Sequence, residues 1–171
     1  YKRQQSSGGQ VGDVNGHGTM TLGCVGAIGN NGVGVVGMAW DIKLMPVRCS
    51  NSSGGGAYLS DLTDGARWAV DNGARAVSVS YSGGESSSVE STGSYLRSQN
   101  GLMSWASGNG GNQVNGSDHA NVIMVGATNS SDNRTSWSTY GAWVDVVAPG
   151  DSIRTTTNGG GNGSASGTSF S

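Results

Sequence analysis

Residues 77–106 read VSVSYSGGESSSVESTGSYLRSQNGLMSWA, and this stretch decides the fold. Apolar residues alternate with polar ones from Val77 to Tyr81, which predicts a strand. A Ser-Gly-Gly break follows, and residues from about 89 to 99 predict a helix that ends at an Asn-Gly pair. The apolar run Leu102–Ala106 predicts a second strand. A strand, a helix and a strand in this order are typical of a parallel α/β unit.

The same alternation extends in both directions from this unit. Helical spacing predicts helices from His17 to about Ile28 and from Leu59 to Val70. The first 16 residues are polar and Gly-rich and predict a loop. Short apolar runs predict further strands, at 43–47 (where a proline weakens the pattern), 122–125 and 144–147. We therefore expect one α/β domain with a mostly parallel sheet.

Gly/Ser-rich loops follow several of the expected strands. They are Gly54-Gly55-Gly56, Ser82-Gly83-Gly84 and Ser107-Gly108-Asn109. Ligands of such sheets bind beyond the carboxyl ends of the strands. The sequence therefore predicts a site at that edge.

Composition limits the classes of protein that remain. The chain has 171 residues, a formal net charge of −2, 34% hydrophobic residues and 32 glycines. This fits either a flexible low-complexity chain or a compact domain with many tight turns, and apolar runs such as Val122–Val125 favour the compact domain. The chain has no basic patch, which argues against a nucleic-acid partner. No apolar run approaches the length of a membrane span, so we expect no membrane partner.

The two cysteines, Cys24 and Cys49, match no zinc-binding pattern. Two small core residues are the favoured interpretation. One disulfide is the alternative, if the protein is secreted.

Three short segments carry residues that could support nucleophilic catalysis. His17 lies in Gly-His-Gly-Thr at the start of an expected helix, Asn109 lies in Ala-Ser-Gly-Asn after a strand, and Ser169 lies in Ser-Gly-Thr-Ser. A serine hydroxyl needs a base such as imidazole to become a nucleophile, and an amide donor can stabilise an oxyanion. Taken singly, each has a plainer interpretation: a structural histidine, an Asn-Gly turn and a polar tail. His119, in a polar loop, is expected to be a solvated loop residue.

Together the three segments resemble the motifs of the subtilisin-like serine proteases, the subtilases. They occur in that family's order and at about its spacing, and Val147-Ala148-Pro149-Gly150 matches the stretch before the family's serine. The resemblance implies a three-layer α/β/α fold with a mostly parallel central sheet. It also implies a serine endopeptidase that works through an acyl-enzyme, with His17 as base, Ser169 as nucleophile and Asn109 as oxyanion donor. The implied protein is a secreted monomer that binds a polypeptide in an extended conformation.

The resemblance also implies binding residues beyond the catalytic ones. A Gly-rich strand would pair with the substrate, and two segments would form the walls of the pocket for the P1 side chain. These residues are Gly55, Gly56, Ala57 and Tyr58 for the strand, and Ser80, Tyr81, Ser82, Ala106, Ser107 and Gly108 for the walls. The chemistry needs no cofactor, but a structural calcium ion could bind a loop through Gly29, Asn31, Val33 and Val35.

The sequence departs most from the family pattern at two places, with smaller departures at Met20, at Tyr81 and in the loop at 110–121. The Asp-Thr/Ser-Gly motif of the catalytic acid does not precede His17, and Asp13 matches only a surface-loop acid of the family. Two residues follow Ser169, where the family continues with a buried helix. We therefore expect residues 1–171 to be a partial peptidase domain truncated at both ends and inactive by itself. The alternative is a non-catalytic, subtilase-like binding module, a pseudoprotease.

Overall fold

The computed structural model describes residues 3–4, 12–116 and 118–171, and it divides into two compact units. Unit 1 holds the chain up to Gly65 together with Ser152–Ala165, and unit 2 holds Ala66–Asp151 together with Ser166–Ser171. The boundary crosses helix α2 (Leu59–Asp71), so this helix contributes to both units.

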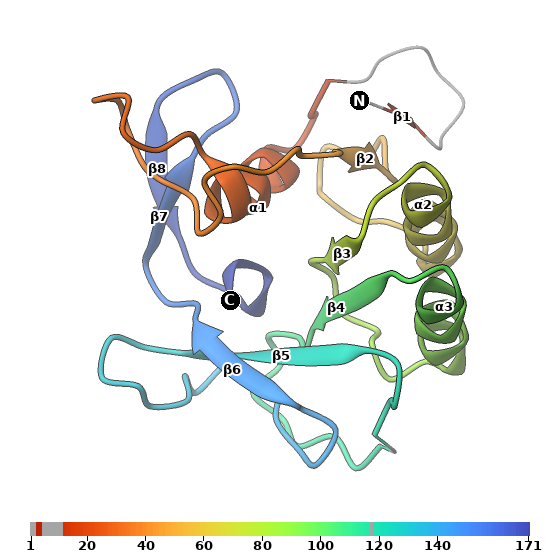
Figure 1. The fold of residues 1–171 in the computed structure, drawn as a ribbon. Coiled ribbons are helices and arrows are strands. Elements are labelled where there is room, and N and C mark those ends of the chain that lie inside the picture. The colour runs from red at the N-terminus through yellow and green to blue at the C-terminus, as the bar shows by residue number, and fades with distance from the viewer. Residues whose placement is uncertain (1–2, 5–11, 117) are drawn as a thin grey trace. The chain divides into compact units, whose positions relative to one another are not determined.

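Unit 2 is built on a parallel sheet of four strands in the order β3-β4-β5-β6 (Figure 1). The strands are β3 (Ala76–Val79), β4 (Leu102–Ala106), β5 (Ile123–Thr128) and β6 (Val146–Pro149). Parallel neighbours need a crossover connection, and helix α3 (Ser87–Ser98) supplies the one between β3 and β4. Because all four strands run the same way, their carboxyl ends share one edge of the sheet. The predicted α/β class is confirmed.

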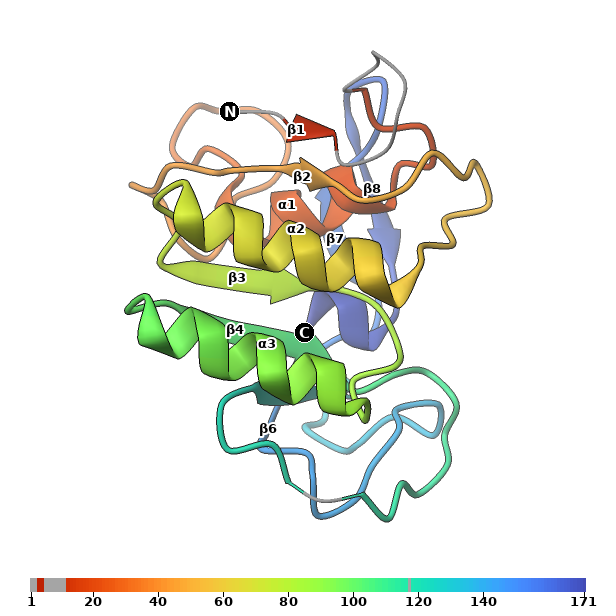
Figure 2. The ribbon, with the colours of Figure 1, turned by 90° about the vertical axis from the view of Figure 1, so that its right-hand side faces the viewer.

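Helix α3 packs on this sheet through apolar and small residues. Val89 and Leu96 are fully buried, and Figure 2 shows the helix running beside β4. Gly93 permits close approach, since a Cβ there would lie 2.4 Å from the carbonyl oxygen of Asn121. The largest buried side chains of the unit include Met103, Trp105, Met124 and Trp143.

The part of α2 that belongs to unit 2 lies against α3. The guanidinium carbon of Arg67 is 4.8 Å from the centre of the Tyr95 ring. The Tyr95 hydroxyl donates a hydrogen bond to Asp71 Oδ1 at 2.8 Å. The bond between Tyr95 and Asp71 is solvent-exposed, so we expect it to add little to stability.

Unit 1 is centred on helix α1 (His17–Gly26), against which a hairpin packs. The antiparallel strands β7 (Ile153–Thr156) and β8 (Asn162–Ala165) form this hairpin. The hydroxyls of Thr155 and Thr156 donate to the carbonyl oxygens of Met20 and Thr19 at 2.6 and 2.9 Å. A parallel pair of two-residue strands, β1 (Arg3–Gln4) and β2 (Val47–Arg48), also belongs to this unit.

Several boundaries differ from those predicted. The expected strand at 43–47 forms only from Val47, since Pro46 has no N–H to donate to a ladder. Tyr81 lies beyond the end of β3, and β6 begins at Val146 rather than at 144. In the expected N-terminal loop, Arg3 and Gln4 form β1, whereas residues 5–11 lie outside the described part of the chain.

Both cysteines are free thiols and half-buried, so the disulfide alternative is not realised in the structure. Burial raises the pKa of Cys49 to about 11, with help from the charges of Asp61 and Asp64. Cys49 also packs closely, because a Cβ on Gly65 would lie 2.5 Å from its Sγ. A thiol with so high a pKa stays protonated and unreactive near neutral pH.

The contact between α1 and β7 depends on Gly23. A Cβ there would lie 2.2 Å from Thr156 Oγ1 and 2.9 Å from the backbone nitrogen of Thr156. We expect Gly23→Ala to lower the free energy of unfolding by about 1–3 kcal/mol, because overpacking displaces the hairpin. Denaturant unfolding measures this, with Gly12→Ala as the control, since a Cβ on Gly12 meets nothing within 4 Å. Equal midpoints for the two variants would contradict the close approach.

Candidate active site

The segment that carries Ser169 rests on the residue that follows β6. Gly150 N–H donates to the Thr128 carbonyl at 3.0 Å, and Gly167 N–H donates to the Gly150 carbonyl at 2.9 Å. A Cβ on Gly150 would lie 2.7 Å from Ala127 Cβ and 2.9 Å from the Gly167 carbonyl oxygen, so only glycine fits. From this support the chain enters a short 3₁₀ helix, η1 (Thr168–Phe170).

A second hydrogen bond joins the same two segments of the chain. The hydroxyl of Ser166 donates to Asp151 Oδ1 at 2.8 Å. Asp151 and Ser166 are the points at which the chain leaves unit 2 and returns to it. The Ser169 segment is therefore fixed to the end of β6 by two hydrogen bonds.

The side chain of Asn109 is oriented by Thr168. Its Oδ1 accepts hydrogen bonds from Thr168 N–H at 2.9 Å and from Thr168 Oγ1 at 3.0 Å. The Thr168 hydroxyl in turn accepts a bond from Gly108 N–H at 3.1 Å, and Thr168 is only 3% exposed. Since both donors hold the amide oxygen, the amide NH₂ group of Asn109 is directed away from Thr168. A Cβ on Gly167 would lie 3.3 Å from that nitrogen.

Ser169 lies beside the end of β3. Its hydroxyl donates to the Ser80 carbonyl at 3.3 Å, and the Ser80 hydroxyl donates to the Ser169 carbonyl at 3.1 Å. A small cavity is lined by these two serines together with Ala106 and Thr168, among others. The structure thus brings Ser169, the Asn109 segment and Ser80 together at the carboxyl edge of the sheet.

The remaining wall residues lie at the same edge of unit 2. Ala106 ends β4, and the Ser107 hydroxyl, which is buried, donates to the Thr139 carbonyl at 3.1 Å. Gly108 has a φ of 100°, a value that favours glycine. Tyr81 is half-buried and Ser82 is exposed.

His17 is the first residue of α1 in unit 1, and its ring is half-buried. Burial lowers the pKa of His17, and the negative charge of Asp13 opposes this effect in part. The neutral imidazole, which can accept a proton, is therefore the favoured form near neutral pH.

Asp13 caps helix α1. Its Oδ1 accepts from the N–H groups of Asn15 and Gly16 at 3.1 and 2.8 Å, and its Oδ2 accepts from Thr19 N–H and Oγ1 at 2.8 and 2.7 Å. Partial burial alone would raise the pKa of Asp13, but these hydrogen bonds together lower it below its ordinary value. The geometry makes this carboxylate a helix cap, as suits a surface-loop acid.

The residues expected to pair with substrate lie in unit 1 and form no strand. Gly55 has a φ of 82° and follows a turn in which its N–H donates to the Ser52 carbonyl at 3.1 Å. Gly56 and Ala57 continue the chain to Tyr58, which is 80% exposed. The amide of Asn15 donates to the Ser53 carbonyl at 2.8 Å, which ties this loop to the segment before His17.

The loop expected to bind calcium also lies in unit 1. Gly29, Val33 and Val35, which would bind calcium through their backbone carbonyls, flank Asn31 in the sequence. Asn31 Oδ1 accepts a hydrogen bond from Val33 N–H at 3.0 Å. These four residues offer oxygens, the ligand type that calcium prefers, but four are fewer than the six to eight it takes. The described residues contain no cluster of three or more His, Cys, Asp or Glu that could hold a metal ion.

The expectation for His119 was wrong. Its side chain is only 9% exposed, its Nε2 lies 2.8 Å from the Gly84 carbonyl oxygen, and its Nδ1 lies 3.7 Å from Glu90 Oε2. The polar surroundings in the sequence suggested a solvated loop. The partners come from 29 or more residues away along the chain, so no local pattern shows them.

Comparison with known proteins shows the family. The model of the subtilase family of peptidases matches residues 2–171, so the chain belongs to the subtilases. It is 37% identical over 163 residues to alkaline elastase YaB of Bacillus sp. (strain YaB), covering 94% of this chain and 43% of that protein. It is also 35% identical over 145 residues to thermitase of Thermoactinomyces vulgaris, covering 83% and 52%.

Solved structures confirm the subtilisin-like fold. A cold-adapted subtilisin-like serine proteinase superimposes with a TM-score of 0.78 at 29% identity, covering 95% of this chain and 59% of that one. A protease of Pseudoalteromonas arctica also gives a TM-score of 0.78 at 29% identity, covering 91% and 54%. The chain thus spans about half the length of the relatives and structures it matches.

The capping role of Asp13 predicts a pH-dependent stability. A carboxyl whose pKa falls on folding stabilises the native state above its ordinary value of 3.8, and this stabilisation is lost as the pH drops through the lower folded pKa. We expect Asp13→Ala to cost about 1 kcal/mol near pH 7. The difference from the parent should shrink below about pH 4.

Thermal unfolding of the parent and the variant between pH 2 and pH 7 measures this dependence, with replacement of the exposed Asp41 by Ala as the matched control. A constant difference between the parent and Asp13→Ala across the whole range would contradict the capping role.

Proposed function

We propose that this chain carries the nucleophile, the base and the oxyanion donor of a serine endopeptidase. The observation that carries the proposal is the fixed orientation of Asn109: both hydrogen bonds from Thr168 go to its oxygen, which leaves its NH₂ group as a donor beside the Ser169 segment. A donor fixed before the reaction stabilises developing charge without reorganising.

The mechanism follows from these roles. Ser169 Oγ attacks the carbonyl carbon of the scissile peptide while His17 accepts the hydroxyl proton. The oxygen of the tetrahedral intermediate receives hydrogen bonds from Asn109 Nδ2 and from the backbone N–H of Ser169. The C–N bond then breaks, His17 gives its proton to the leaving amine, and the acyl group stays on Ser169. Water, deprotonated by His17, hydrolyses this ester and restores the serine.

The lowered pKa of His17 suits the role of base, because the neutral ring is available to accept the proton. The triad also needs a carboxylate that fixes the tautomer of this ring. Both oxygens of Asp13 accept hydrogen bonds from the start of α1, so we do not assign this role to Asp13. In this mechanism the carboxylate belongs to a part of the full-length protein outside these 171 residues, which span about half the length of the relatives.

The substrate in this proposal is a polypeptide in an extended conformation. Gly55 to Tyr58 offer backbone that is not part of any sheet, which suits pairing with an added strand. Ser80 to Ser82 and Ala106 to Gly108 would contact the side chain that precedes the scissile bond. The two hydrogen bonds between Ser80 and Ser169 support this second assignment, because they place the first of these segments beside the nucleophile.

We further propose that the protein acts outside the cell as a monomer, in keeping with the subtilase proteases that it resembles. Across residues 3–4, 12–116 and 118–171, no helix combines the length and apolar character that crossing a bilayer requires.

Covalent labelling tests the proposed function. In the full-length natural chain that contains these residues, a fluorophosphonate should form a bond from phosphorus to Ser169 Oγ and release fluoride. Mass spectrometry of the labelled peptide identifies the serine. We expect Ser169→Ala to abolish labelling and peptide hydrolysis, and Asn109→Ala to lower kcat by about 10²–10³, a figure carried over from subtilisin, a member of the same family.

A folded full-length protein that neither takes the label nor cleaves peptides would overturn the proposal in favour of the binding module. Hydrolysis that survives Ser169→Ala would show that another group is the nucleophile.

Calcium binding is a separate proposal, in which the ion stabilises the loop at Gly29–Val35 and takes no part in the chemistry. The loop gives one amide oxygen and backbone carbonyls, so further ligands would have to come from water or other residues. We expect millimolar calcium to raise the Tm of the full-length protein and Asn31→Ala to reduce this rise. A calcium-independent Tm, measured after chelation and after calcium is restored, would rule the proposal out.

A further inference from the structure

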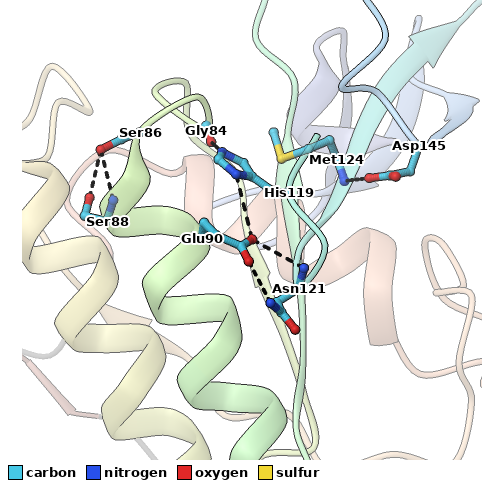
Figure 3. A network of polar contacts seen from close by, with 8 residues as sticks. All are labelled: Gly84, Ser86, Ser88, Glu90, His119, Asn121, Met124 and Asp145. Atoms are coloured by element: carbon cyan, nitrogen blue, oxygen red, sulfur yellow. Dashed lines mark hydrogen bonds and ion pairs between the residues drawn. The ribbon is translucent and has the colours of Figure 1, made fainter. Parts of the chain in front are cut away.

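A histidine outside the proposed catalytic residues, with a side chain only 9% exposed, joins three segments of unit 2. His119 precedes β5, Gly84 follows β3, and Glu90 lies in the first turn of α3. Figure 3 shows the His119 ring between the Gly84 carbonyl and the Glu90 carboxylate. We call the group formed by His119, Gly84, Glu90 and Asn121 the His119 bridge.

The contact with Gly84 fixes which ring nitrogen of His119 carries a proton. A carbonyl oxygen only accepts hydrogen bonds, so Nε2, at 2.8 Å, must donate. Nδ1 then faces Glu90 Oε2 at 3.7 Å, where a proton on the ring would complete an ion pair. A residue at position 119 with no donor at this place would leave the Gly84 carbonyl without this hydrogen bond.

Glu90 extends the bridge to the start of β5. Its Oε1 accepts from Asn121 Nδ2 at 2.6 Å, and its Oε2 accepts from Asn121 N–H at 3.3 Å (Figure 3). Its own carboxylate is thereby held between His119 and Asn121. One charged side chain thus connects α3 to the end of the loop that begins after Asn109.

The core holds Gly84 through close packing. A Cβ at this position would lie 2.3 Å from Met124 Cε, 2.9 Å from Trp105 Cδ1 and 3.2 Å from Trp143 Cζ3. The backbone of Gly84 is therefore pressed against buried side chains, while its carbonyl accepts from His119. Gly84 follows Ser82 by two residues, so a backbone fixed here limits how far Ser80 to Ser82 can move.

We propose that His119 is a positioning residue for substrate selection: by holding Gly84 it sets the position of the Ser80–Ser82 wall, and so the preference for the side chain before the scissile bond. This inference rests on the proposed function, in which that wall contacts substrate. His119 touches neither the nucleophile nor the peptide, so its effect falls on the ratio between substrates more than on the chemistry.

The test compares two peptide p-nitroanilides that differ only in the residue before the scissile bond, alanine in one and phenylalanine in the other. In the full-length natural chain, we expect His119→Leu to change the ratio of their kcat/KM values about fivefold or more, mostly through KM. His119→Gln should restore most of the parent ratio, because its amide can donate to Gly84. Glu90→Gln should shift the ratio in the same direction as His119→Leu, which keeps the test valid if His119→Leu does not fold.

Tyr95→Phe is the matched control, because it removes a hydrogen bond of α3 at 2.8 Å that has no link to the wall. A fall in Tm with an unchanged substrate ratio in His119→Leu and Glu90→Gln would show a purely structural role and overturn the inference. If His119→Gln shifts the substrate ratio as much as His119→Leu does, the hydrogen bond donated to Gly84 has no role in substrate selection.

Amide hydrogen exchange separates this inference from the proposed function. Backbone amides of residues 80–85 should exchange about tenfold faster in His119→Leu than in the parent, and at the parent rate in Tyr95→Phe. Unchanged exchange would refute the bridge whatever the activity. A parent that hydrolyses neither substrate would overturn the proposed function and with it the role in selection.

Discussion

One amide oxygen links two distant parts of unit 2. Asn109 Oδ1 accepts two hydrogen bonds from Thr168, a residue 59 positions along the chain, and Thr168 accepts one from Gly108 in return. These three bonds join the end of β4 to the Ser169 segment, and the buried Thr168 shields one side of them from water. The parallel sheet supplies the edge at which the two segments meet. The orientation of the Asn109 amide depends on the bonds from Thr168.

Close backbone contacts explain much of the unusual composition. Gly150 lies against the Ser169 segment, and Gly84 lies against the tryptophans of the core. Gly23 lets the β7–β8 hairpin pack closely on α1. At each of these positions a Cβ would come within 3.0 Å of another group. At these three positions glycine is required by close packing, and at others, such as Gly108, by a positive φ.

The sequence predicted the parallel unit well, because Leu102–Ala106 and the helices at 59–71 and 87–98 have strong apolar periodicity. It missed the β7–β8 hairpin, whose strands are rich in Thr, Gly, Ser and Asn and have little apolar alternation. It also predicted that the loops at Ser82-Gly83-Gly84 and Ser107-Gly108-Asn109 end strands at one edge of the sheet, whereas Ser80 and Ser169 were predicted only through the resemblance to the subtilases. The bonds of Thr168 and His119 could not be predicted, because they depend on contacts between residues far apart in the chain.

Residues 152–165 leave unit 2 and return to it, and hydrogen bonds join the two ends of this segment. Gly167 donates to Gly150, and Ser166 donates to Asp151, so both ends of the segment are held within unit 2 itself. The entropy of closing a loop rises only slowly with its length, by about 0.6 kcal/mol for each doubling. The exposed tip of the hairpin, residues 158–161, can therefore change in length across evolution while the Ser169 segment keeps its position, whereas Thr155 and Thr156 remain tied to α1.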